Sequence, residues 1–159
     1  IGEEGKKNLM AFVRQGGAFI GSHCASDTFY QWEDYGKMLG GYFNGHPWHE
    51  EVTLNIENHD HPATRHLEGT WQLKDEIYQF KNWDRKRLKV LVSVDTDSVD
   101  MTRKSINRKD ADFGVTWTRK EGKGRVFYTA LGHRPEVWAS ESFQHHLLGG
   151  VFWATRRAD

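Results

Sequence analysis

The sequence lacks the features that mark membrane, disulfide-stabilised and nucleic-acid-binding proteins. It has one cysteine, so it cannot form an internal disulfide, which fits a reducing compartment. Its 22 basic and 22 acidic residues balance, which argues against electrostatic binding of nucleic acid or an acidic membrane. Its apolar runs are far shorter than the ~20 residues that span a bilayer. No signal peptide is visible, so we expect a cytoplasmic protein, or a periplasmic one if a signal peptide precedes this sequence.

Aromatic and histidine side chains are abundant instead. The chain has seven tryptophans, five tyrosines, nine phenylalanines and nine histidines. Aromatic rings with polar tips often line sugar sites, because a ring face can cover the apolar C–H face of a pyranose. For any single ring, however, a place in the core is the better expectation. The composition is therefore compatible with a small-molecule carbohydrate ligand but does not identify the residues that would bind it.

Hydrophobic periodicity predicts a single α/β domain over residues 1–159. Polar residues without a clear period predict a loop over 95–112, and two glycines predict a hairpin turn at 122–124. The predicted helices are residues 3–15, 28–39 and 142–154. The predicted strands are residues 18–21, 52–56, 71–80, 89–94, 113–118 and 124–130.

This order of elements indicates a three-layer fold of the flavodoxin or amidotransferase type with a mainly parallel sheet. The sequence begins within a predicted helix, whereas doubly wound sheets usually begin with a strand. Either the N-terminal strands of the sheet are missing, so that the chain is a fragment of a longer domain, or the topology is unusual. A sheet edge left open in this way could pair with a partner segment or support a homo-oligomer.

The stretch GGAFIGSHCASDT, residues 16–28, predicts a buried strand that ends in a sharp turn opening a helix. Such an elbow exposes one side chain for chemistry. Here that side chain is His23, which is either a metal ligand or general base, or a turn histidine bonded to the backbone. Its neighbour Cys24 is expected to be a small buried residue rather than a reactive thiol.

Two further histidine positions have the same pair of interpretations. His133 follows a predicted strand and a glycine, and Arg134 beside it either binds an anionic or hydroxyl group or is a surface charge. In the segment Gly45-His46-Pro47-Trp48-His49, proline favours a loop over a chelating helix. We take His46 as a site residue and leave His49 open. The alternative is a rigid loop packed by Trp48.

The segment Asp75-Glu76-Ile77-Tyr78 places two carboxylates before a tyrosine. Strand alternation puts Glu76 and Tyr78 on one face, and Asp75 with Ile77 on the other. Glu76 is then a general acid/base or a metal ligand and Tyr78 lines the pocket, or Glu76 is merely an edge-strand charge. The remaining histidines are expected in loops, packing or surface positions. They are His59, His61, His66, His145 and His146.

Together these segments resemble the ThuA-like (trehalose utilisation) family of the class I glutamine amidotransferase-like superfold. The resemblance covers about residues 3–154 in order, and no single segment decides it. The matching segments are GGAFIGSHCASDT, YGKMLGGYFNGHPWHEEV, HPAT, DEIYQF, GKGRVFYTALGH and FQHHLLGGVFWA.

The amidotransferases carry Gly-x-Cys-x-Gly at their elbow, with cysteine as the nucleophile. On that pattern the nucleophile position here is His23, and Ala25 replaces the second glycine, whereas Cys24 lies one residue too late. The resemblance therefore implies a retained elbow without a cysteine-dependent amidotransferase mechanism. His133 corresponds to the region of the triad histidine, so we expect both histidines at the carboxyl ends of parallel strands.

The resemblance implies use of trehalose or related glycosides, often beside oxidoreductases that make 3-keto sugars. We expect acid/base chemistry with His23, Glu76 and His133, as a hydrolase, lyase or isomerase. A divalent metal such as zinc, held by His23, His133 and either His46 or Glu76, would assist this chemistry; without a metal, His23 and Glu76 would form an acid/base pair. The alternative is a non-catalytic carbohydrate-binding or regulatory module. The residues expected to bind substrate are His46, Trp48, Tyr78, Trp32 and Arg134.

Overall fold

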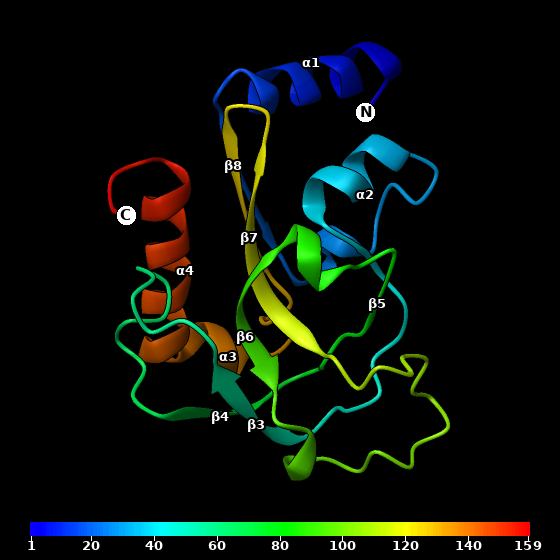
Figure 1. The fold of residues 1–159 in the computed structure, drawn as a ribbon, viewed down its shortest axis with the longest axis vertical. Coiled ribbons are helices and arrows are strands. Elements are labelled where there is room, and N and C mark those ends of the chain that lie inside the picture. The colour runs from blue at the N-terminus through cyan, green and yellow to red at the C-terminus, as the bar shows by residue number, and fades with distance from the viewer.

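A computed structural model describes residues 1–159 as an α/β fold around a six-stranded sheet (Figure 1). The helices are α1 (Glu3–Arg14), α2 (Glu33–Leu39), α3 (Pro135–Ala139) and α4 (Glu141–Ala154). The strands are β1 (Ala18–Ser22), β2 (Tyr42–Phe43), β3 (Glu51–Ile56), β4 (Thr70–Lys74), β5 (Phe80–Lys81), β6 (Lys89–Val94), β7 (Gly114–Glu121) and β8 (Gly124–Thr129). Short 3-10 turns are η1 (His23–Ser26), η2 (Arg85–Arg87) and η3 (Thr96–Ser98).

The six strands lie in the order β1-β8-β7-β6-β3-β4, and β2 pairs with β5 in a separate ribbon. Only β1 and β8 are parallel, and every other pairing in the sheet is antiparallel. The prediction of a mainly parallel sheet is therefore wrong. The physical reason lies in the connections: β7 and β8 are joined by a tight turn with Gly122 at φ +59°, and such a turn can only reverse the chain.

The strand β1 lies at one edge of the sheet and pairs only with β8. The expectation that strands preceding this sequence are missing is not confirmed by the structure. No helix of the structure has both the length and the apolar character required to cross a membrane.

The helices cover both faces of the sheet, which gives the predicted three layers. In Figure 1, α4 lies on one side of β7 and β8, and α2 lies on the other. Alternation along β8 explains this arrangement: the Phe127 ring lies against Gly150 of α4, whereas Tyr128 lies against Gly21 and the α2 side. The Trp117 indole of β7 donates to the carbonyl of Leu39 at 2.7 Å, which fixes the end of α2 on the sheet.

Several predicted elements differ from the observed ones. The helix predicted over 28–39 begins only at Glu33, because Phe29 adopts a positive φ of 52°, which a helix does not tolerate. The strand predicted over 71–80 ends at Lys74, and the segment 75–79 that follows is irregular, with an isolated bridge between Ile77 and Trp48 outside the sheet. This interruption matters for function, because the acidic pair lies within it.

Candidate functional site

The predicted elbow is present at the end of β1. His23 follows Ser22 directly, opens η1 and has φ +43°, in the left-handed region that side chains rarely adopt. Its carbonyl accepts a hydrogen bond from the Tyr128 hydroxyl at 2.7 Å, and that hydroxyl also contacts Ser26 at 2.8 Å. These buried contacts hold the unusual backbone in place, so the His23 side chain has a fixed direction.

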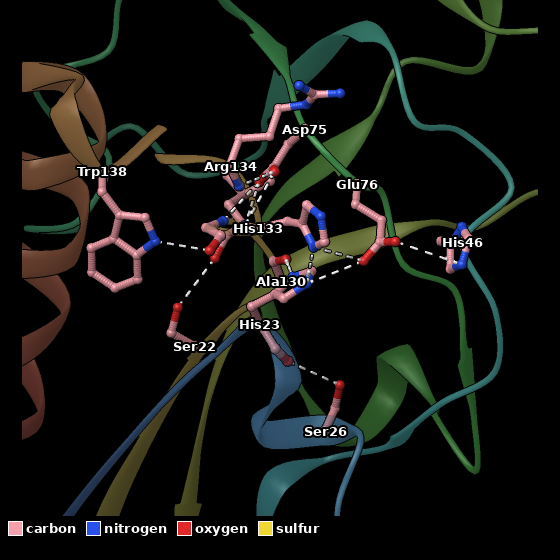
Figure 2. A network of polar contacts seen from close by, with 12 residues as sticks. Ser22, His23, Ser26, His46, Asp75, Glu76, Ala130, His133, Arg134 and Trp138 are labelled. Carbon is pink, nitrogen blue, oxygen red and sulfur yellow. Dashed lines mark hydrogen bonds and ion pairs between the residues drawn. The ribbon is translucent and has the colours of Figure 1, made fainter. Parts of the chain in front are cut away.

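Three predicted site residues meet at this elbow (Figure 2). The Nε2 atom of His23 lies 3.2 Å from Oε2 of Glu76 and 3.2 Å from Nδ1 of His133. The third side of the triangle, from Nδ1 of His133 to Oε2 of Glu76, is 3.1 Å. They come from the end of β1, the segment after β4 and the loop after β8, which the sheet brings together.

The hydrogen bond of the other His23 nitrogen determines what its Nε2 can do. Nδ1 lies 2.8 Å from the carbonyl oxygen of Ala130, and because a carbonyl can only accept, Nδ1 carries the proton. In the neutral imidazole Nε2 therefore has a lone pair, and it is directed at Glu76 and His133. This pattern, in which the distal nitrogen donates to a carbonyl, is the usual arrangement of a metal-binding histidine.

A proton count shows that the triangle is not satisfied by neutral histidines. The Glu76 carboxylate only accepts, and neutral His23 only accepts at Nε2, so the sole available proton is one on Nδ1 of His133. The contact between His23 and Glu76 would then oppose two lone pairs at 3.2 Å. Either a second proton on His23 or a cation between the three atoms removes the conflict.

The dimensions of the triangle suit a metal ion. Ligand atoms about 2.1 Å from one ion and about 90–110° apart lie about 3.0–3.4 Å from each other. The three edges of 3.1, 3.2 and 3.2 Å agree with this, and these residues form a group of ligand atoms close enough to bind one ion. Two histidines and one carboxylate are the ligand set of several catalytic zinc and non-haem iron sites.

His46 lies at the rim of this cluster rather than in the triangle. Its Nε2 is 3.6 Å from Oε1 of Glu76, the carboxylate oxygen that the other two histidines do not contact. The His49 ring packs edge-on against His133 at 5.2 Å between centroids. The side chains of His133 and His46 are 42% and 48% exposed, against 12% for Glu76. Solvent, and hence a ligand, reaches the cluster from the side on which His46 and His133 lie.

Tyr78 packs on the inner side of the cluster. Its ring lies 4.2 Å from the His23 ring and 4.4 Å from that of Phe43, measured between centroids. Burial, with a smaller contribution from the nearby Glu76 charge, raises the pKa of the Tyr78 hydroxyl. The hydroxyl is therefore protonated at neutral pH, and the ring restricts the orientation of the imidazole.

The other predicted binding residues lie apart from the triangle. Trp48 is fully buried, and its indole donates to the carbonyl of Asp100 at 3.2 Å, so it packs the loop instead of lining a pocket. Trp32 lines a groove of about 450 Å³ beside α1, together with residues such as Lys6. The Arg134 side chain extends away from the Glu76 carboxylate in Figure 2, and its Nε is buried without a hydrogen-bond partner.

Two residues beside the site differ from expectation. Cys24 is exposed, not buried, because it lies on the outer side of η1, one residue after the inward-facing His23. Asp75 was assigned no role, yet its carboxylate is fully buried and accepts hydrogen bonds from the backbone of Gly132, His133 and Arg134. The only signal in the sequence is that strand alternation directs this acidic residue inward. A carboxylate buried there requires hydrogen-bond donors around it.

The fold and site define an α/β protein with a histidine at the turn that ends β1. A comparison with protein families matches the ThuA family, described as trehalose utilisation, over residues 1–154. The chain belongs to this family, which confirms the resemblance. A comparison with curated proteins found no match.

Solved structures agree with the assignment of the fold. A ThuA-like protein from Bacteroides uniformis ATCC 8492 is similar with a TM-score of 0.80 and 24% identity, covering 96% of this chain and 64% of that one. A ThuA-like protein from Parabacteroides merdae ATCC 43184 gives a TM-score of 0.75 and 20% identity, covering 96% and 65%. The chain thus spans slightly less than two thirds of the length of these two relatives.

A more distant likeness extends to part of a larger enzyme. A β-galactosidase from Bacillus circulans sp. alkalophilus shares the fold with a TM-score of 0.56 and 13% identity, over 94% of this chain and 20% of the enzyme. At this identity the likeness concerns the fold alone.

Proposed function

We propose that this domain acts on a trehalose-like or 3-keto glycoside by metal-assisted acid/base chemistry at the His23–Glu76–His133 triangle. The observation that carries the proposal is the commitment of the His23 Nδ1 proton to Ala130, which leaves three converging atoms that a cation between them would satisfy. Membership of the ThuA family supports a carbohydrate as the substrate class.

Each residue of the triangle has a defined part in this proposal. His23 Nε2, His133 Nδ1 and Glu76 Oε2 would hold a divalent metal such as zinc. When bound, the metal supplies a Lewis acid that polarises a carbonyl or hydroxyl oxygen. The second oxygen of Glu76 stays outside the triangle and faces His46, so it is available to accept a proton and pass it to that exposed imidazole.

The exposure of the cluster supports a soluble polar substrate that approaches from outside. His46 and His133 form the open side, whereas His23 and Glu76 lie behind them. A carbonyl on a sugar ring makes the proton of the neighbouring C–H bond more acidic. A carboxylate base beside a cation that polarises the carbonyl can therefore remove this proton. The stated substrate class follows from that match and from the family.

Metal content of the purified full chain tests the proposal. Elemental mass spectrometry should find close to one equivalent of a divalent metal in the wild type and a large loss in His23→Ala. The matched control is His145→Ala, an exposed histidine of α4 outside the cluster, which should keep the metal of the wild type. Absence of metal from all three proteins would overturn the metal-assisted mechanism.

A second candidate function, a carbohydrate-binding or regulatory module without catalysis, is favoured by the histidine at the elbow, where the amidotransferases that this sequence resembles carry a cysteine nucleophile. Incubation with 3-keto-trehalose distinguishes the two. Turnover that disappears in His23→Ala supports the enzyme. Binding without turnover, undiminished by His23→Ala, supports the module.

A further inference from the structure

Asp75 is the most deeply buried carboxylate beside the site. Its side chain belongs to a fully buried residue, and the bonds it accepts come from backbone N–H groups. Oδ2 accepts from Gly132 at 2.7 Å, and Oδ1 accepts from His133 at 3.2 Å and from Arg134 at 3.1 Å. Burying a carboxylate is costly unless it accepts hydrogen bonds in this way, so the Asp75 side chain and the loop stabilise each other.

Three consecutive N–H groups converge on one anion only if the loop folds into a compact concave turn. Gly132 makes this possible with φ +108°, a conformation that other residues rarely adopt. The carbonyls of the same loop have separate partners, because Ser22 donates to Leu131 at 3.2 Å and Trp138 donates to Gly132 at 2.8 Å (Figure 2). Asp75 therefore holds the donor side of the loop.

The position of Asp75 in the chain gives this contact a functional meaning. Asp75 immediately precedes Glu76, and the N–H that it binds at Oδ1 belongs to His133 itself. One carboxylate thus ties together two segments, 57 to 59 residues apart, that each supply an atom of the triangle. The third atom, on His23, is fixed separately through Ala130.

We propose that Asp75 is a positioning residue, which sets the separation of Glu76 and His133 so that the metal-binding triangle is formed before a ligand arrives. The effect of Asp75 on metal binding rests on the proposed function, whereas its stabilisation of the loop at residues 132–134 does not. Groups that orient metal ligands typically change metal affinity by 10–100-fold when they are removed.

The test compares metal-free and zinc-titrated wild type with Asp75→Asn. Asparagine is nearly the same size, but it offers one acceptor oxygen and turns an NH2 group towards the loop amides.

We expect the amides of residues 132–134 to lose protection from hydrogen exchange, and the zinc dissociation constant to rise about 10–100-fold. The matched control is Asp97→Asn, an exposed aspartate of η3, which should change neither quantity.

A double-mutant cycle separates positioning from general destabilisation. In a His133→Ala background the loop no longer supplies a ligand, so Asp75→Asn should weaken zinc binding by less than about 2-fold further. An equal fold-loss in both backgrounds would overturn the proposal, as would unchanged amide exchange and affinity in Asp75→Asn alone. If the wild type binds no zinc, the metal role fails with the proposed function, and the exchange data still decide whether Asp75 holds the loop.

Gly132→Ala provides a second variant if Asp75→Asn does not fold. It leaves the carboxylate in place but strains the turn, because a Cβ there meets Phe143 and Trp138 at 3.2 Å and φ is positive. The expected result is again loss of amide protection at 132–134 together with weaker zinc binding. Wild-type affinity in this variant would contradict the requirement for the folded turn.

Discussion

His23 and His146 are both buried histidines beside the end of β8, but their second nitrogens face different partners. In each residue Nδ1 donates a hydrogen bond to a backbone carbonyl at 2.8 Å. The acceptor is Ala130 for His23 and Ala63 for His146. The Nε2 of His146 then meets the hydroxyls of Thr116 and Thr129, both at 3.3 Å. The Nε2 of His23 meets a carboxylate and another imidazole.

The difference separates a structural histidine from a ligand histidine. A hydroxyl can donate or accept, so His146 is satisfied as a neutral ring, and burial lowers its pKa to about 4. A carboxylate cannot donate, so His23 is satisfied only by a further proton or a cation. Burial alone does not distinguish the two, whereas the chemistry opposite the second nitrogen does.

The largest expected effect on stability is that of His146→Ala. It removes a fully buried ring and leaves the Ala63 carbonyl and two hydroxyls with lost partners, which should lower the free energy of unfolding by about 3 kcal/mol. Urea unfolding of the metal-free protein measures it. His145→Ala, its exposed neighbour, should stay within about 0.5 kcal/mol of the wild type. Equal stability of both variants would contradict the structural role assigned to His146.

Metal-dependent stabilisation should follow the other histidine. At a free zinc concentration of 100 times the dissociation constant, the wild type should gain about 2.7 kcal/mol, because only the folded state has the triangle. Glu76→Gln and His23→Ala should lose most of this gain, since the first replaces an anionic carboxylate ligand with a neutral amide and the second removes an imidazole ligand. Thermal unfolding with and without zinc measures it. A full gain in either variant would mean that zinc binds elsewhere.

Acidification should destabilise the protein through its buried neutral histidines. Burial lowers the pKa of both His61 and His146 to about 4, against 6.5 for a free histidine. Between those values the unfolded state binds more protons, so stability is complete above pH 6.5 and falls as the pH drops towards 4. The slope is at most about 1.4 kcal/mol per pH unit for each histidine.

Urea unfolding at about pH 7, 6 and 5 checks this dependence. His61→Asn should make the decline shallower, because its side-chain oxygen can still accept from the Ala63 N–H while the titrating group is gone. An unchanged slope in this variant would assign the acid sensitivity to other groups.

Local patterns were sufficient for the helices and the elbow but not for the sheet. The periodicity of residues 3–15 and 142–154 predicted α1 and α4, and the glycine-flanked apolar run predicted β1 with its turn. The pairing of β1 with β8 joins residues more than 100 positions apart, and no local pattern encodes such a contact. The mainly parallel sheet was inferred from the order of the elements, and the antiparallel pairings of β3, β4, β6, β7 and β8 contradict it.

The site divides in the same way. Residues that carry reactive groups at strand ends could be predicted, and His23, Glu76 and His133 do lie together. Asp75 could not, because its partners are backbone amides of a distant loop, which leave no mark on the side-chain sequence. Trp48 was predicted to bind substrate but lies in the core. The sequence cannot separate the two cases, because an aromatic residue near a site histidine can pack in a core or line a pocket.

The smallest expected effect is that of Cys24→Ala, which tests whether the residue next to His23 at the elbow has a role of its own. The thiol is exposed and supplies no atom of the triangle, so unfolding should change by less than about 0.5 kcal/mol and zinc affinity should be unaltered. A glutaminase assay on wild type and variant should detect no activity in either, because the nucleophile position holds an imidazole. Glutamine hydrolysis that disappears in Cys24→Ala but survives His23→Ala would make the thiol the reactive group, and the functional role would pass from the buried histidine to its exposed neighbour.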